Sequence, residues 1–542
     1  MNILPVAGLG DGFWNENGNE YFVRSFFVIA SVLVIAGAAT AADFNLIPWP
    51  ERVQPLAGQF SLDEKTVIVA DAPFTNEAAW LAGKILLPLT AAAKGDVIRL
   101  TTQGAENLGD EAYALEVDHQ GATIRAHSSA GAFYGSQTLS QLLSAKKIPC
   151  VKIEDAPRYA WRGMMLDVSR HFFDKPTILQ LLDWMAAYKL NRFHLHLTDD
   201  QGWRLEMEKY PELTQTGAVG NYSDTNTPAC FFTRTDIQEI IRYAAQRHIV
   251  VVPEIDMPGH AGAVARTYPT LAGSTNSFNP ASEQTYAFLE NVLRDTMELF
   301  PSPWIHFGGD EVKSSAWKNN PDAIKKMQAD GLKDTKQLES SFVRRIAGFI
   351  AKNGRTPAGW DEIAAAGTGP GALIYWWRHD KPEVLTQALA GGHSVVLSPR
   401  APCYFDYPQD KSFPYVGGWK LWITPEDVYR GPSIPTNIPP AQLKQILGVE
   451  GCVWTERITT VPYLEFMILP RMIALSEMAW TADGQRDFVQ FNFRLKPHLE
   501  AYRQLGIQFY DAANPAETRR SALQAGVDFR GWTNLAEAIS KR

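Results

Sequence analysis

The sequence predicts an α/β fold, a (β/α)8 TIM barrel preceded by a small α+β domain. Two observations point to the barrel: eight short apolar runs follow about residue 156, and amphipathic helical segments separate most of them. A third observation is a hairpin pattern beside helical spacing in the segment before the barrel, which is typical of an α+β unit. The predicted boundaries are 1–42 for an N-terminal extension and signal peptide, 43–155 for the small domain, 156–505 for the catalytic barrel and 506–542 for a C-terminal tail.

The N-terminal segment carries an export pattern. Residues 26–41, FFVIASVLVIAGAATA, are apolar, end in small residues and follow Arg24. This is typical of a secretory signal peptide cleaved after Ala41, and the run is short for a membrane span. We therefore expect an exported protein, periplasmic or secreted, with no stable membrane partner after cleavage. Because acidic residues precede the run, we also hypothesise that the natural start lies near Val23.

Composition limits the partners and cofactors. A net charge of −8 argues against nucleic acid or an anionic membrane as a partner. The 16 tryptophans fit either a large core or a sugar-stacking site. The four cysteines are widely spaced without a C-x-x-C motif, which excludes zinc-ribbon and thioredoxin-type sites. No cofactor is expected, and the disulfide pairing and oligomeric state are left open.

In the small domain, residues 113–128 alternate apolar and polar positions on both sides of a Gln120-Gly121 turn, which predicts a hairpin. Apolar residues at helical spacing predict helices over 76–93 and 129–145. No catalytic pattern occurs in this domain, so we expect it to support the barrel.

In the barrel, short apolar runs predict the strands. The runs are 163–168, 192–198, 249–255, 304–309, 355–360, 372–377, 394–398 and 446–454. Helical spacing predicts intervening helices at 176–190, 235–248 and 334–354. Thr235 and Gln238 have capping-box spacing at the start of the second helix, and Gly354 is a C-terminal signal of the third.

Active sites of TIM barrels lie at the carboxyl ends of the strands. Those ends combine acidic groups with tryptophans, a mixture that suggests a carbohydrate site. In strand order the candidates are Arg162, Asp167, Arg170; Asp199, Asp200; Glu254, Asp256, His260; Asp310, Glu311; Trp360, Asp361, Glu362; Trp376, Trp377; Tyr404, Asp406; Trp454 and Glu456.

Two chemistries compete for these residues. The HLH run at 194–196, with His260 and His306, leaves a metal-dependent barrel hydrolase as an alternative. Glycoside hydrolysis normally needs two carboxylates on opposite sides of the scissile bond. Asp310 and Glu311 are consecutive, with Cα atoms about 3.8 Å apart, so they approach a sugar from one side. Either the second carboxylate lies elsewhere, for example at Glu456, or the nucleophile is not a protein group.

Several long motifs carry a family resemblance. RGMMLDVSRHF (162–172), HLHLTDDQGWRLE (194–206), VVPEIDMPGHAGA (251–263), HFGGDEV (306–312), YFDY (404–407) and GVEGCVWTE (448–456) occur in this order. Together they resemble glycoside hydrolase family 20, the β-N-acetylhexosaminidases, over about residues 44 to 480. The resemblance implies exo-acting release of terminal β-linked GlcNAc or GalNAc with retention, through an oxazolinium formed by the substrate's own acetamido group.

The resemblance also implies roles for the residues around the acidic pair. Glu311 would protonate the leaving oxygen and then activate water. Asp310 would accept the acetamido N–H and orient that group. Asp199 and His260, with Asp256, would form a network that orients the acid.

The remaining carried-over residues would bind the sugar. Arg162 would donate to hydroxyls of the terminal sugar, and Asp406 and Glu456 would accept from them. Tyr404 would hydrogen-bond the acetamido oxygen. The pocket walls would be Trp360, Trp377 and Trp454, with Trp376 as the alternative to its neighbour.

Two alternatives to this function remain. A non-catalytic glycan-binding relative would keep the tryptophans but has no need for Asp310 beside Glu311. A metal-dependent barrel hydrolase is the second. The partner class is N-acetylhexosamine-containing oligosaccharides or glycoconjugates, and the natural glycan and the GlcNAc or GalNAc preference stay open.

Overall fold

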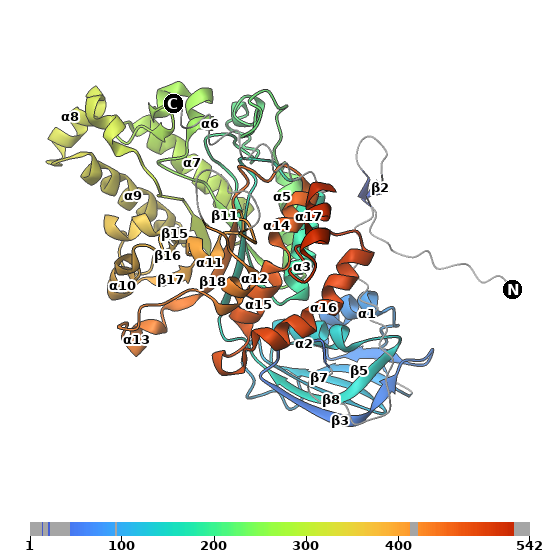
Figure 1. The fold of residues 1–542 in the computed structure, drawn as a ribbon. Helices are drawn as coiled ribbons and strands as arrows, with labels where there is room; N and C mark the ends of the chain where they lie inside the picture. Colours follow the sequence, from blue (N-terminus) through green and yellow to red (C-terminus); the bar gives the residue numbers. More distant parts are fainter. Residues whose placement is uncertain (1–12, 15–19, 22–43, 93–94, 412–420, 525–542) are drawn as a thin grey trace.

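A closed barrel of eight parallel strands forms the centre of the protein, which confirms the predicted TIM barrel (Figure 1). The computed structural model describes residues 13–14, 20–21, 44–92, 95–411 and 421–524, so the predicted signal peptide at 26–41 lies outside the described residues. The strands are β9 (Trp161–Asp167), β10 (Arg192–His196), β11 (Val250–Glu254), β14 (Trp304–His306), β15 (Thr356–Trp360), β16 (Leu373–Trp376), β17 (Ser394–Leu397) and β18 (Ile446–Val453). Each corresponds to one predicted run.

The strand register brings polar residues to one level of the barrel. His196 on β10 pairs with Asp167 on β9 and with Glu254 on β11. Glu254 in turn pairs with His306 on β14. Because paired residues of neighbouring parallel strands point to the same face, these four side chains form one layer at the carboxyl end.

Helices surround the barrel. The longer ones are α3 (Lys175–Ala187), α5 (Arg234–Ala245), α7 (Glu283–Leu299), α8 (Pro321–Ala329), α9 (Thr335–Lys352), α10 (Pro382–Ala390), α14 (Val461–Ile468), α15 (Arg471–Trp480) and α16 (Phe488–Gln504). Shorter elements in the loops are α4 (Glu212–Gln215), α6 (Gly262–Thr267), β12 (Ala272–Ser274), β13 (Ser277–Phe278), α11 (Arg400–Cys403), α12 (Pro425–Arg430) and α13 (Pro440–Leu443). Within the described chain, no helix has the length and apolar character needed to cross a membrane. The C-terminal part of the described chain ends with α17 (Pro515–Gln524).

Two helix caps were predicted from sequence, and the structure confirms one of them. Gly354 follows the last turn of α9 with φ 75°, the left-handed conformation expected of a C-terminal glycine. The capping box of α5 is formed by Thr233 and Asp236, whose side chains bond each other's backbone N–H. The predicted box at Thr235 and Gln238 is therefore wrong, because the helix begins two residues earlier.

The small domain is an α+β layer at the amino end of the barrel (Figure 1). Its six-stranded sheet has the order β3-β8-β6-β7-β5-β4, and α1 (Thr75–Ile85) and α2 (Ser129–Leu142) pack with it. The strands are β3 (Arg52–Ser61), β4 (Val67–Ala70), β5 (Val97–Thr101), β6 (Tyr113–Asp118), β7 (Gly121–Ala126) and β8 (Lys147–Asp155). β6 and β7 form the predicted hairpin. A separate pair, β1 (Phe13–Trp14) and β2 (Glu20–Tyr21), is antiparallel.

Buried ion pairs join the two domains. The Arg162 guanidinium on β9 donates to Glu111 of the small domain at 2.8 and 3.0 Å. The Lys189 ammonium contacts Asp155 at 2.9 Å, and both side chains are almost fully buried. Trp480 Nε1 donates to the same Asp155. The small domain is thus tied to the barrel by charged groups that are wholly or largely buried.

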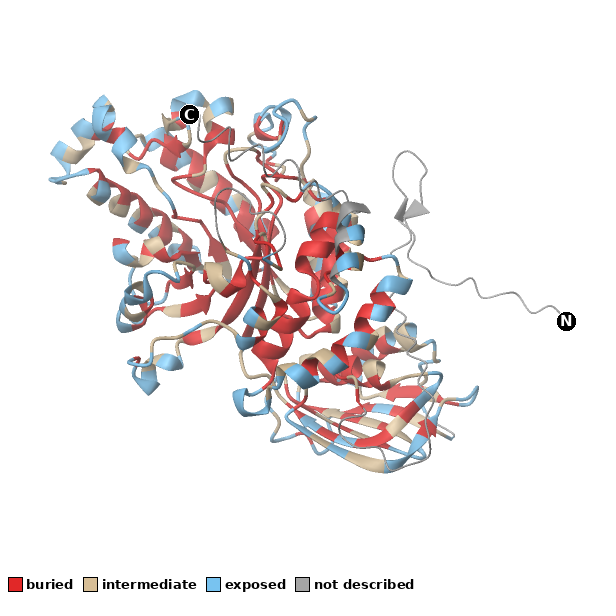
Figure 2. Cartoon of the chain, in the orientation of Figure 1, coloured by how far each residue is buried: buried red, intermediate tan, exposed pale blue. Residues whose placement is uncertain are grey.

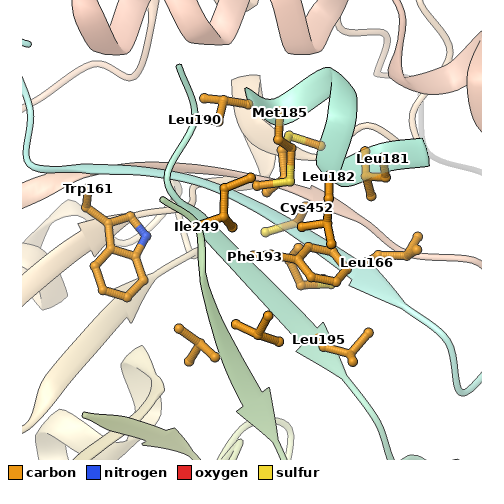
Figure 3. Packing of buried hydrophobic residues seen from close by; sticks show 14 of the residues in the cluster. Trp161, Leu166, Leu181, Leu182, Met185, Leu190, Phe193, Leu195, Ile249 and Cys452 are labelled. Atoms are coloured by element: carbon orange, nitrogen blue, oxygen red, sulfur yellow. The ribbon is translucent and has the colours of Figure 1, made fainter. Parts of the chain in front are cut away.

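Burial is concentrated in the barrel strands and the inner faces of the helices (Figure 2). Figure 3 shows how side chains of α3, such as Leu182 and Met185, pack with strand residues such as Phe193 and Cys452. All four cysteines are free thiols: Cys150, Cys230, Cys403 and Cys452.

Candidate active site

The acidic pair lies in a glycine-rich loop after β14, which ends at His306. Gly308 and Gly309 have φ values of 69° and 95°, which L side chains rarely adopt. A Cβ on Gly308 would lie 1.7 Å from Asp256 Oδ1, so the loop can pass this carboxylate because the residue is glycine. The loop, rather than the strand itself, places Asp310 at the carboxyl end of the barrel.

Asp310 and Glu311 converge on one histidine. His260 Nε2 lies 3.4 Å from Asp310 Oδ2 and 3.8 Å from Glu311 Oε2. Successive side chains of an extended strand point to opposite faces, but Glu311 has φ 49° and turns toward the same nitrogen. Asp310 is buried, whereas the Glu311 side chain is 60% exposed. The two carboxylates therefore occupy one side of the site.

A charged network supports His260. Asp199 Oδ1 lies 3.2 Å from His260 Nδ1, and Asp199 Oδ2 lies 2.6 Å from an Arg170 guanidinium nitrogen. Burial opposes ionisation of Asp199, but the charges of Arg170 and His260 hold its pKa well below the usual range. Burial would likewise lower the pKa of His260, yet Asp199 and Asp310 raise it well above normal. His260 is therefore a cation facing the acidic pair.

Arg162 does not reach this site. It is the second residue of β9, about 16 Å along the strand from the last one, Asp167, at about 3.3 Å per residue. It is fully buried, and its donors bind the small-domain carboxylate of Glu111 and the backbone oxygens of Tyr159 and Lys189. The predicted role of Arg162 in sugar binding is thus wrong, because it lies at the amino end of the barrel.

Arg170 lies at the carboxyl end of the same strand. It contacts Asp167 and Asp199, and its guanidinium lies 5.0 Å from the centre of a Trp454 ring. The sequence placed it among the strand-end candidates without a binding role. The signal that identifies it is its position three residues after Asp167, at the carboxyl end of β9.

Aromatic rings line the same end of the barrel. Trp454 lies 5.6 Å from Trp360 and 6.1 Å from Tyr404, between ring centres. Trp377 stacks on Tyr404 at 6.5 Å with 13° between the planes. The structure therefore groups three predicted wall tryptophans with Tyr404.

The sixth strand resolves the choice between neighbouring tryptophans. Trp376 is buried and its Nε1 points to the Lys381 carbonyl oxygen at 3.4 Å. Trp377 donates from Nε1 to Glu362 at 3.0 Å and is partly exposed. Burial and the charges of Asp361 and Asp310 raise the pKa of Glu362 to about 8. Glu362 thus holds the Trp377 ring.

Several carboxyl groups at this end have raised pKa values or acceptor atoms without a partner in the described chain. Burial and the charge of Glu456 raise the pKa of Asp406 to about 8, and burial raises the pKa of Glu456. Asp310 Oδ1 and Asp406 Oδ1 are buried with no hydrogen-bond partner among the described residues. Buried polar atoms normally have partners, so these two atoms indicate a polar ligand.

Asp256 faces the acidic pair from β11's loop. Burial and the charge of Asp310 raise its pKa well above the ordinary value. Neither carboxyl oxygen has a hydrogen-bond partner in the described chain. Burial and its neighbour Asp310 therefore favour the protonated form of Asp256.

Histidines and carboxylates cluster closely enough to raise the metal alternative again. His194, Glu254 and His306 form one such group, and Asp256, His260 and Asp310 form another. The histidine nitrogens of the first group face Glu254 at 2.9 to 3.0 Å. His194 Nε2 has no hydrogen-bond partner among the described residues, and His306 Nδ1 accepts from the Gly308 N–H at 3.3 Å. The contacts of these two nitrogens with Glu254 are therefore ion-pair distances rather than hydrogen bonds.

An open cleft of about 540 Å³ adjoins the acidic pair. Asp200, which lines it, follows Asp199 in sequence, and Lys313 lies two residues after Glu311. Its lining residues are Asp200, Gly262, Arg266, Ser274, Thr275, Asn276, Lys313 and Ala316. Its lining does not include Asp310 or Glu311, so the cleft lies next to the acidic pair rather than around it.

Comparison with protein families identifies both domains. Residues 159–483 match the model of the glycosyl hydrolase family 20 catalytic domain, and residues 43–156 match domain 2 of the same family.

Named relatives agree with this match. A β-hexosaminidase of Porphyromonas gingivalis is 33% identical, over 83% of this chain and 62% of that protein. A β-N-acetylhexosaminidase of Cellulomonas fimi is 32% identical, over 86% of this chain and 96% of its own length.

Solved structures show the same likeness. An exo-β-N-acetylglucosaminidase from Vibrio harveyi in complex with N-acetylglucosamine superposes with a TM-score of 0.81 and 30% identity, covering 88% of this chain and 80% of that one. A family 20 β-N-acetylhexosaminidase from Streptomyces coelicolor gives a TM-score of 0.77 and 32% identity, covering 87% and 98%.

Proposed function

Because this chain belongs to glycosyl hydrolase family 20 and is a glycosidase, we propose that it is an exo-acting β-N-acetylhexosaminidase. It removes terminal β-linked N-acetylhexosamine with retention, and the substrate's acetamido group is the nucleophile. The Vibrio harveyi structure named above, which holds N-acetylglucosamine, supports this sugar class.

The observation that carries the mechanism is the convergence of Asp310 and Glu311 on His260 Nε2. Retaining glycosidases with a protein nucleophile hold their carboxyl groups about 5 Å apart, on either side of the bond. Two carboxylates that share one imidazole nitrogen approach from a single side. A nucleophile supplied by the substrate removes the need for a carboxylate on the opposite face.

The two carboxylates divide the work. Asp310, buried and with Oδ1 unpartnered among the described residues, accepts the acetamido N–H and aims the carbonyl oxygen at the anomeric carbon. As that C–O bond forms, the glycosidic bond breaks, and the departing oxygen takes a proton from Glu311. Glu311 then removes a proton from the water that opens the oxazolinium. The positive charge of His260 stabilises whichever of the two neighbouring carboxyl groups, Asp310 or Glu311, is ionised at each step.

Sugar hydroxyls bind at the polar rim. Arg170 replaces Arg162 as the donor, because it lies beside Trp454 at the carboxyl end. Asp406 and Glu456 are the acceptors of sugar hydroxyls. The stacked Trp377 and Tyr404 rings enclose the acetamido side.

The leaving group occupies the cleft beside Glu311. Lys313 and Arg266 line it and provide positive charge and N–H donors. We expect this surface to affect the choice of leaving sugar and to have little effect on simple aryl glycosides.

The decisive experiment compares p-nitrophenyl β-N-acetylglucosaminide with p-nitrophenyl β-glucoside, which lacks the acetamido group. We expect turnover of the first and at least about a thousandfold lower kcat/KM for the second, because proximity of an internal nucleophile contributes several kcal/mol. Comparable turnover of the glucoside would refute substrate assistance. No turnover of either would favour the glycan-binding alternative.

Leaving-group dependence tests the proton donor. Glu311→Gln should lose far more kcat/KM with a disaccharide than with a dinitrophenyl glycoside, which departs without a proton. Asp310→Asn should impair both substrates, because each needs the acetamido group in position. Equal losses of Glu311→Gln on both substrates would count against its role as the acid.

Export remains part of the proposal. The apolar segment at 26–41 ends in small residues, which supports cleavage after Ala41 and a periplasmic or secreted enzyme. N-terminal sequencing of the mature protein from culture fractions tests it, and a mature chain that retains this segment would refute cleavage.

A further inference from the structure

A single carboxylate organises the interior of the barrel. Glu254, the last residue of β11, is fully buried and faces imidazole nitrogens of His196 at 2.5 Å and His306 at 2.9 Å. His194 Nε2 lies 3.0 Å away, and Trp360 donates to Oε1 at 2.9 Å. His196 and Trp360 donate to Glu254, whereas the His194 and His306 nitrogens lie at ion-pair distance from it. These four groups belong to the three strands β10, β14 and β15, so Glu254 connects neighbouring strands below the site.

His196 links Glu254 in the barrel interior to Asp199 at the candidate site. Its Nδ1 faces Glu254, and its Nε2 lies 3.1 Å from Asp199 Oδ2. A neutral imidazole has one N–H, but two carboxylate acceptors on its two nitrogens call for an N–H on each. Burial would lower the pKa of His196, yet the charges of Glu254 and Asp199 raise it well above normal. His196 is therefore an imidazolium held between two carboxylates.

Asp199 links His196 to His260, which faces the reacting carboxyl groups. One of its oxygens faces His196 and the other faces His260 Nδ1. The opposite nitrogen of His260 faces Asp310 and Glu311. Each imidazole and carboxylate along the path thus uses both of its ends, and none can turn without breaking a contact.

The geometry points to Glu254 as a positioning residue for the acidic pair, which acts through His196 and Asp199 on His260. This inference rests on the proposed function, because it assigns a role in the same reaction. Glu254 itself touches no substrate atom in it: its effect is to fix the ring plane and charge of His196, so that Asp199 keeps the orientation that aims His260.

The histidines around Glu254 differ in their pKa values. Against burial, the charges of Glu450 and Glu254 raise the pKa of His194 to about 9, whereas burial lowers the pKa of His306. Asp256, whose pKa is raised by burial and by the charge of Asp310, is also close to His196. Loss of the Glu254 charge consequently removes the carboxylate that faces His196 Nδ1 at 2.5 Å.

Glu450 offers a matched control. It is buried to the same extent as Glu254 and accepts from His194 at 2.9 Å and from Trp161 at 3.2 Å. It makes no contact with His196 or Asp199 in the described chain. Glu450→Gln removes an equivalent interior charge, so it reports the purely structural cost of such a change.

The test is a double-mutant cycle on kcat with a disaccharide substrate. We expect Glu254→Gln to lower kcat about tenfold or more with little change in KM, as losses of groups that orient a reacting residue commonly do. In an Asp199→Asn background, the same substitution should cost less than about twofold, because the path through Asp199 is already broken. Glu450→Gln should have small effects that multiply with those of Asp199→Asn.

Losses of Glu254→Gln that multiply with those of Asp199→Asn would overturn the inference, as would an equal loss in Glu450→Gln. If circular dichroism shows Glu254→Gln unfolded, His196→Gln takes its place in the cycle with the same expectations. A wild-type protein without hexosaminidase activity would refute the proposed function instead, so the two failures are distinguishable.

Discussion

Replacement of Arg162 should destabilise the protein without changing its chemistry. In Arg162→Met the apolar side chain keeps much of the volume but removes the guanidinium that joins β9 to the small domain. The bonds lost are two to Glu111, two to the carbonyl oxygens of Lys189 and Tyr159, and one to the Tyr134 hydroxyl.

The structure sets the size of the effect. Breaking a buried ion pair from one side typically costs about 3–5 kcal/mol, because the other charge stays unpaired. The Glu111 side chain keeps 23% exposure and still accepts from Asn191 at 2.9 Å. We therefore expect the lower end, about 3 kcal/mol, and a partial recovery in Arg162→Met/Glu111→Gln, where the unpaired charge is gone.

Urea unfolding measures the stability, and kcat/KM on an aryl N-acetylglucosaminide measures the chemistry. We expect kcat/KM of Arg162→Met to remain within about twofold of wild type. Arg170→Met should lower it about a hundredfold, which corresponds to about 3 kcal/mol of lost charged hydrogen bonding. If Arg162→Met keeps full stability and loses activity like Arg170→Met, the assignment of the two arginines is wrong.

Three further outcomes follow from single contacts. Trp377→Ala should raise KM several-fold with little effect on unfolding, whereas Trp376→Ala should lower stability by about 3–5 kcal/mol and leave KM unchanged; the reverse pattern would exchange the two. The pKa of His194, raised from 6.5 to about 9, contributes about 3 kcal/mol that is present below pH 6.5 and lost as pH rises through 9. Unfolding free energies measured from pH 6 to 10 should therefore fall less steeply in His194→Gln than in wild type. Gly308→Ala should reduce kcat strongly, because its Cβ would displace Asp256; wild-type kinetics in this variant would contradict the tight loop geometry.

The architecture was predictable because its signals are local. Parallel barrel strands are buried on both faces, so each is a continuous apolar run between polar loops. All eight predicted runs correspond to strands, and the hairpin at 113–128 was located from the alternation on both sides of the Gln120-Gly121 turn.

The predictions that failed concern the position of a residue along its strand or helix and the contacts between strands. Arg162 precedes the first apolar run and Arg170 follows it, so the rule that barrel sites lie at the carboxyl ends of strands favours Arg170. The error came from giving the sugar-binding role to the other arginine of the motif at 162–172. The α5 cap is a similar case, because Thr233 and Thr235 both precede a helical pattern. Glu254 was identified as a strand-end acid, but the groups that face it come from other strands, and pairing register is absent from any local pattern.

The left-handed backbone at Glu311 means that thermal stability and catalytic activity make opposite demands on this residue. A non-glycine side chain in this conformation costs about 1–2 kcal/mol, and glycine would relieve that cost while removing the proton donor. We expect Glu311→Gly to unfold at a slightly higher temperature and to lose turnover of disaccharides. A screen of random variants for heat resistance alone would therefore enrich inactive proteins at this position, so selection for a sturdier enzyme has to score sugar release as well as survival.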